Sequence, residues 1–183
     1  YIMIGRALAE RGYLFISGNT RGHDITASAW SDAQMRMMAA GSAWERLEDS
    51  PLDLAAWVDE AMKFGVEGVV VAGHSQGAAK AVYYQALRQD PRVRGLLLAS
   101  PDLHGHWSAE LVAQARQMVA DGHSNDLLPD FMRAPWYRLS AANVISRAEV
   151  LSHVYTSDHA IPYIATVRCP LLAFFGTVRD VGG

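Results

Sequence analysis

Short apolar runs alternate with stretches of helical periodicity along most of the chain. The apolar runs have the length of buried strands and are bounded by Gly, Pro or Ser; they occupy residues 13–17, 69–72, 93–99 and 170–176. Helical patterns precede or separate them, at residues 4–11, 50–64 and 78–89. Because continuously apolar strands that alternate with helices form parallel sheets, we predict an α/β fold whose mostly parallel sheet is flanked by helices on both faces.

The clearest helix-start signal in the sequence is at residues 50–53. Ser50 is predicted as the N-cap, Pro51 as the first helical residue, and Asp53 as the closing member of an acidic capping box. Residues 25–49 contain tryptophans and methionines without a sustained period, so we predict a loop with a short helix there.

A long stretch separates the last two predicted strands. Residues 102–167 are mainly helical or irregular in pattern, and their clearest helix, at residues 108–119, has one apolar face. The length of the chain fits one domain. We therefore predict a single domain over residues 1–183, in which residues 102–167 form a helical insertion between two core strands.

The composition is that of an ordinary globular domain. The 183 residues are 50% hydrophobic and carry a formal net charge of -3. The sequence shows no basic patch that would indicate nucleic-acid binding, and no apolar run of about 18 residues that would indicate a membrane span. The single cysteine, Cys169, excludes an internal disulfide framework and favours a reducing compartment such as the cytoplasm. A leader segment would precede Tyr1, so the localisation stays open.

Residues 73–77 have the sequence Gly-His-Ser-Gln-Gly, between an apolar run and a stretch of good helix formers. A tight turn from strand to helix is therefore predicted, with the serine in a strained backbone conformation and no room for side chains on either side. Such a turn raises the Ser75 hydroxyl above the sheet. It also places the N–H of Gln76, at the start of the helix, where it stabilises an oxyanion. A glycine-flanked turn of purely structural role is the alternative.

The element order and this motif resemble the α/β-hydrolase superfamily, in which a buried strand, a G-x-S-x-G turn and a helix form the nucleophile elbow. Residues 19–24, Asn-Thr-Arg-Gly-His-Asp, look like the loop after the family's fourth strand, and residues 73–77 match the elbow after the fifth. The loop is either a ligand-binding segment or a well-bonded loop whose Arg21 pairs with a nearby Asp. The helical insertion looks like the family's lid.

The resemblance also implies that this is a partial α/β-hydrolase domain, incomplete at both ends. The first three strands and one oxyanion donor would precede Tyr1, and the eighth strand and the catalytic histidine would follow Gly183. None of the seven histidines in the sequence is then expected to be the base. The 183 residues alone are expected to be inactive and poorly stable, because the sheet would have open edges.

The catalytic acid of the family usually follows the seventh strand, and Asp180 stands there, at a longer spacing than is usual. Asp102, after the sixth strand, is the alternative. A third possibility is that neither residue is the catalytic acid. His74 occupies the variable position of the motif and is expected to point away from the serine. His23 and His104 are candidates for the mouth of the pocket.

Together these features predict a serine hydrolase that cleaves a carboxylic ester or thioester through an acyl-enzyme, with a small-molecule acyl substrate and no metal or organic cofactor. Ser75 would attack, the Gln76 N–H would stabilise the oxyanion, and Asp180 would orient the histidine. Acyl transfer or amide hydrolysis would use the same groups. A hydrolase-fold protein that binds a ligand or partner without catalysis is a further possibility. The sequence predicts neither the oligomeric state nor the identity of the acyl group.

Overall fold

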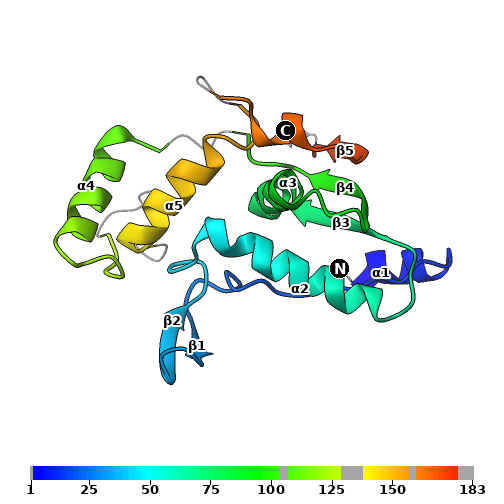
Figure 1. The fold of residues 1–183 in the computed structure, drawn as a ribbon, viewed down its shortest axis with the longest axis horizontal. Helices are drawn as coiled ribbons and strands as arrows, with labels where there is room; N and C mark the ends of the chain where they lie inside the picture. The colour runs from blue at the N-terminus through cyan, green and yellow to red at the C-terminus, as the bar shows by residue number, and fades with distance from the viewer. Residues whose placement is uncertain (1, 104–106, 129–137, 157–159, 177–183) are drawn as a thin grey trace, which may run out of the picture.

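A computed structural model describes residues 2–103, 107–128, 138–156 and 160–176 (Figure 1). Its elements follow in chain order: α1 (Ile2–Ala9), β1 (Ala27–Ser31), β2 (Arg36–Ala40), the 3-10 helix η1 (Leu47–Asp49), α2 (Ser50–Met62), β3 (Val69–His74), α3 (Gln76–Arg88), β4 (Val93–Ala99), α4 (Ala109–Ala120), α5 (Ala141–Leu151), α6 (Tyr163–Thr166) and β5 (Leu171–Phe174). Within the described ranges, no helix is both long and apolar enough to cross a membrane.

The main sheet is parallel, with the strand order β3-β4-β5. Val71 of β3 lies opposite Leu96 of β4, and Leu98 of β4 lies opposite Ala173 of β5. β4 is the central strand, and its leucines 96 and 98 are almost fully buried. The parallel sheet and three of the four predicted strands, β3, β4 and β5, are confirmed.

Two apolar clusters hold the helices in place. In the first, α3 packs on β3 and β4, and α2 packs beside α3 (Figure 1). Leu54 and Val58 of α2 are buried there against Val82 of α3, as the predicted apolar face of that helix requires. The second cluster lies between α4 and α5, around Ala115 and Val144. α4 and α5 lie within residues 102–167, while the insertion as a unit and its role as a lid stay predictions.

Residues 13–17 do not form the predicted buried strand. Tyr13 is exposed, and the segment has no strand pairing in the structure. Instead the chain after α1 packs along α2: Trp57 Nε1 donates a hydrogen bond to the backbone oxygen of Asn19 at 3.0 Å. Gly18 lies so close to the Trp57 ring that an added Cβ would be 1.9 Å from Cζ2. An apolar run was therefore mistaken for a sheet strand where the chain packs against a helix.

The prediction of a loop and short helix at residues 25–49 is also wrong in part. β1 and β2 form an antiparallel hairpin that projects from the body of the molecule, with Trp30 opposite Met37 (Figure 1). Met35 in the turn has a positive φ of 51°. Because such turns usually carry Gly or Asn at positive φ, the sequence had none of the ordinary hairpin signals. The short helix is present as the 3-10 helix η1.

The predicted capping box at the start of α2 is not formed. Ser50 lies inside the helix, one residue after η1, and its Oγ donates to the carbonyl of Leu47 at 2.7 Å. Asp53 instead accepts a hydrogen bond from the backbone N–H of Arg21 at 3.0 Å. The 3-10 helix η1 directly precedes α2 where a serine cap was predicted. The Asp53 carboxylate contacts Arg21 instead, 32 positions away in the sequence.

A buried carboxylate fixes the turn between α3 and β4. Asp90 accepts hydrogen bonds from Arg92 Nε at 2.9 Å, from the backbone N–H of Arg92 at 3.0 Å and from Tyr84 Oη at 2.6 Å. The hydrogen bonds from Arg92, supported by Tyr84, hold the pKa of Asp90 well below its usual range although burial acts in the opposite direction. Arg92 also reaches the exposed Asp59 of α2 at 2.6 Å.

Asp90→Asn should lower the free energy of unfolding by about 1–3 kcal/mol, because Arg92 and Tyr84 lose a charged acceptor. The pKa of Asp90 is lowered by folding, so its stabilising effect is complete above about pH 4, the unfolded value, and is lost as the pH falls toward the folded value. Urea denaturation at several pH values should therefore show a smaller acid-induced loss in the variant.

Asp59→Asn is the matched control. Asp59 is also a partner of Arg92, but the Asp59 side chain is mostly exposed. This variant should leave the unfolding free energy nearly unchanged. Equal losses in the two variants would contradict the importance given to Asp90.

Candidate active site

The carboxyl ends of the three parallel strands meet at one edge of the sheet. Just after β3, the N–H of Ser75 donates to the carbonyl of Ala99 at 3.0 Å. Just after β4, the N–H of Ser100 donates to the carbonyl of Phe174 at 2.7 Å, and its Oγ accepts from the N–H of Gly176 at 3.4 Å. In open α/β sheets, this edge is the place where ligands bind.

Ser75 connects β3 to α3 in a strained backbone conformation. Its φ is 53° and its ψ is −122°, a combination that non-glycine residues rarely adopt. The carbonyl of Ser75 accepts from the N–H of Ala78 at 3.0 Å, so the chain turns into the helix immediately. The residue is exposed, and the serine hydroxyl is therefore presented outward at the end of the sheet.

The two glycines of the motif differ in what they do. A Cβ added to Gly73 would lie 2.2 Å from the carbonyl oxygen of Gly77 and 2.6 Å from the nitrogen of Ala78. Gly73 is thus needed for the close approach of strand and helix. A Cβ added to Gly77 would meet nothing within 4 Å in the described part of the chain. The expectation that there is no room for side chains on either side of the serine holds at Gly73. At Gly77 it is wrong within the described part of the chain.

Gln76 is the first residue of α3. Backbone N–H groups in the first turn of a helix have no partner within the helix, and they lie at the positive end of its dipole. The N–H that follows Ser75 in sequence is therefore a donor at the site where a serine-bound oxyanion would form.

The loop at residues 18–24 is bound firmly to α2. Arg21 donates from Nε to Asp53 Oδ1 at 2.9 Å, and its Nη1 forms an ion pair with Asp49 at 3.0 Å. Burial acts to lower the pKa of Arg21, but the hydrogen bond to Asp53 and the negative charges of Asp53, Asp49 and Glu45 together raise that pKa. Of the two interpretations of this loop, the well-bonded one is confirmed. His23, in the same loop, is exposed, and its Nδ1 lies 3.0 Å from Asp24 Oδ2.

The remaining predicted site residues are dispersed or lie outside the described residues. His74 ends β3 and is exposed. Asp102 lies two residues beyond Ser100; burial, and then the charge of Asp102, raise the pKa of Tyr155. Within the described residues, the structure shows no hydrogen bond between Ser75 and His23. His104 and Asp180 fall in the ranges that the structure does not describe.

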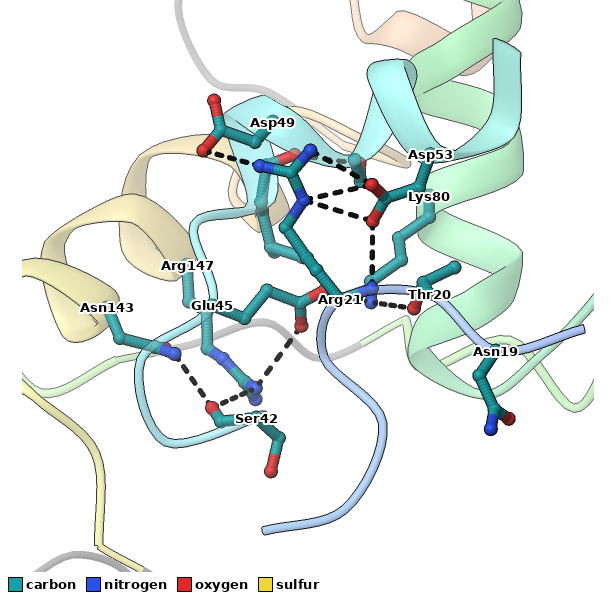
Figure 2. A network of polar contacts seen from close by, with 12 residues as sticks. Asn19, Thr20, Arg21, Ser42, Glu45, Asp49, Asp53, Lys80, Asn143 and Arg147 are labelled. Atoms are coloured by element: carbon teal, nitrogen blue, oxygen red, sulfur yellow. Dashed lines mark hydrogen bonds and ion pairs between the residues drawn. The ribbon is translucent and has the colours of Figure 1, made fainter. Parts of the chain in front are cut away.

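One polar cluster near this site was missed by the sequence analysis (Figure 2). Lys80 of α3 and Glu45 form a buried ion pair, and Arg147 of α5 lies 3.9 Å from the other oxygen of Glu45. Lys80 could have been noticed, because it stands within an otherwise apolar stretch of α3. In the described part of the chain, no group of three or more His, Cys, Asp or Glu side chains is arranged to hold a metal ion.

Comparison with known proteins gives one family and several distant structures, of which two are described. The sequence profile of the alpha/beta hydrolase fold matches residues 1–150. The monoacylglycerol lipase of Paleococcus ferrophilus is similar with a TM-score of 0.47 and 15% identity, over 75% of this chain and 69% of that one. A proposed aryl esterase of Burkholderia cenocepacia has a TM-score of 0.39 and 21% identity, over 75% of this chain and 56% of that one. No curated protein sequence matches. Structural similarities of this size carry no information on the reaction.

Gly73→Ala should destabilise the fold by about 1–3 kcal/mol, because the new methyl group would collide with the backbone of α3. Gly77→Ala is the matched control, because it adds the same atom in open space and replaces a helical glycine. The free energy of unfolding of this variant should be unchanged or raised by up to about 1 kcal/mol. Chemical denaturation of both variants checks this. Equal tolerance at the two positions would contradict the tight turn.

Proposed function

The chain belongs to the α/β-hydrolase fold family, and on that basis we propose that it is part of a serine hydrolase that cleaves a carboxylic ester or thioester. The observation that carries the proposal is the strained, exposed Ser75 between β3 and α3. Strain of this kind in a non-glycine residue concentrates at functional sites. A turn of purely structural role could use glycine at this position without strain.

In the proposed reaction Ser75 Oγ attacks the acyl carbon and its proton passes to a histidine base. The carbonyl oxygen becomes an oxyanion, and the Gln76 N–H at the start of α3 donates to it. Collapse of this intermediate breaks the bond to the alcohol or thiol, which leaves with the proton from the histidine. Water then attacks the acyl-enzyme with the histidine again as base, and the acid and Ser75 are released.

The histidine is expected beyond Gly183, and Asp180 is proposed to fix its tautomer and to stabilise its protonated form. Asp102 remains the alternative for this role. Support for Asp180 comes from its place after β5, the strand whose end lies beside Ser100 at the same sheet edge. No metal or organic cofactor takes part in these steps.

The insertion at residues 102–167 is proposed to cover the site as a lid. α4 and α5 pack on each other through a separate apolar cluster, so this part of the chain has its own core. Ser108 caps α4 by accepting from the N–H of Leu111 at 3.1 Å. A helical unit with its own core, inserted at the carboxyl edge of the sheet, fits the apolar pocket that an acyl group needs.

Ser75→Ala in the complete protein should abolish labelling by a fluorophosphonate probe and lower ester turnover at least about 10³-fold, because the nucleophile is lost. Ser100→Ala is the matched control, since Ser100 lies at the same edge after the neighbouring strand. It should still be labelled. Mass spectrometry of the modified peptide identifies the site, and full turnover by the Ser75 variant would contradict the proposed function. Absence of both labelling and turnover in the well-folded parent protein would favour a non-catalytic binding protein.

Asp180→Asn should lower kcat by about 10²–10⁴-fold with little change in KM, because the histidine loses the group that fixes its tautomer. Asp102→Asn tests the alternative acid in the same assay. A large loss for Asp102 and none for Asp180 would reverse the assignment. Transfer of the acyl group to an added alcohol or amine, measured in the parent protein, distinguishes an acyltransferase from a hydrolase.

A further inference from the structure

Glu45 is the point at which four segments of the chain converge. It is 3% exposed, and its carboxylate forms the ion pair with Lys80 of α3. Its other oxygen faces Nη2 of Arg147 in α5 at 3.9 Å (Figure 2). The loop at residues 18–24 packs directly on it: a Cβ added to Gly22 would lie 2.3 Å from the carboxylate. A side chain at position 22 would therefore push the loop away from Glu45.

Lys80 carries this contact to the start of α3. It lies four residues after Gln76, so the two residues are on the same face of the helix, one turn apart. Lys80 Nζ also donates to Thr20 Oγ1 at 3.3 Å. The first turn of α3, which contains the proposed oxyanion donor, is thereby tied both to Glu45 and to the loop that carries His23.

The segment that carries Glu45 is fixed to α5 as well. The carbonyl of Ser42 accepts from Asn143 Nδ2 at 2.8 Å and from Arg147 Nη2 at 3.2 Å. Asn143 and Arg147 are both buried residues of α5. Through residues 42–45, the helix of the insertion and the helix that follows Ser75 therefore share one set of polar contacts (Figure 2).

A buried ion pair is weak support for stability as such, since the loss of hydration offsets the attraction between the charges. It does restrict geometry, because each buried charge must stay close to its partner to offset its loss of hydration. Geometry matters at a serine nucleophile: displacement of a catalytic group by about 1 Å can reduce the rate about 100-fold.

We propose that Glu45 and Lys80 are positioning residues of the active site: their buried ion pair sets the place of the first turn of α3, and so of Ser75 and the Gln76 N–H, relative to the loop at residues 18–24 and to α5. This inference rests on the proposed function. Neither residue needs to touch the substrate.

The test is the double variant Glu45→Met/Lys80→Met in the complete protein, which removes both charges and keeps similar volumes. We expect a melting temperature close to that of the parent, while fluorophosphonate labelling of Ser75 and kcat for a p-nitrophenyl ester fall at least about tenfold and KM changes little. Glu45→Gln keeps the shape but breaks the ion pair and leaves Lys80 buried without its charged partner, so it should slow labelling of Ser75 and also lower the melting temperature.

Glu60→Met/Lys63→Met is the matched control, because it removes an ion pair of the same two residue types from the exposed side of α2. It should leave labelling, kcat and KM unchanged. A well-folded Glu45/Lys80 double variant with parental labelling and kcat would overturn the positioning role and leave the proposed function intact.

If the double variant does not fold, Thr20→Val decides, since it removes only the hydrogen bond between Lys80 and the loop. We expect it to slow labelling of Ser75 without a change in KM, and parental kinetics would overturn the proposal. Absence of labelling at Ser75 in the parent protein is a separate outcome. It would refute the proposed function first, and the positioning role with it.

Discussion

The left-handed backbone of Ser75 is the constraint on which the site depends. A non-glycine residue stays in such a conformation only where its surroundings hold it there. Here the N–H of Ser75 is bound by Ala99 of β4, and its carbonyl is bound by Ala78 of α3. Gly73 lets the helix approach the strand closely enough for both contacts. The position of one hydroxyl group therefore requires the neighbouring strand, the following helix and the tight turn at the same time.

Around this turn, apolar and polar contacts differ in how closely they fix the relative positions of the elements. The first apolar cluster packs the sheet with α2 and α3 and also takes in Val150 of α5, while the second packs α4 with α5. The buried cluster of Glu45, Lys80 and Arg147 connects α3 to α5 as well. Apolar packing tolerates small shifts between surfaces, whereas ion pairs and hydrogen bonds have defined distances and angles. The polar contacts of Glu45 are thus suited to fix the register between α3 and α5 more closely than the apolar contacts of Val150 do.

The sequence predicted the features that depend on local patterns. β3, β4, β5 and α3 were found because continuous apolar runs and a G-x-S-x-G motif are visible over a few residues. Residues 13–17 were misjudged because an apolar run does not show whether it meets a strand or a helix. The hairpin at Trp30 and Met37 has no glycine in its turn. The contacts of Glu45 span 35 positions to Lys80, and no local pattern reports such a distance.

The chemistry of the lysines has a consequence for how this molecule can be observed. The sequence holds two lysines: Lys63 is largely exposed on α2, whereas Lys80 is enclosed beside Glu45. Amine-directed reagents will modify Lys63 readily, but they reach Lys80 only when the surrounding segments separate for a moment. The slow modification of Lys80 therefore reports the free energy of that local opening. The fast modification of Lys63 supplies an internal standard in the same molecule.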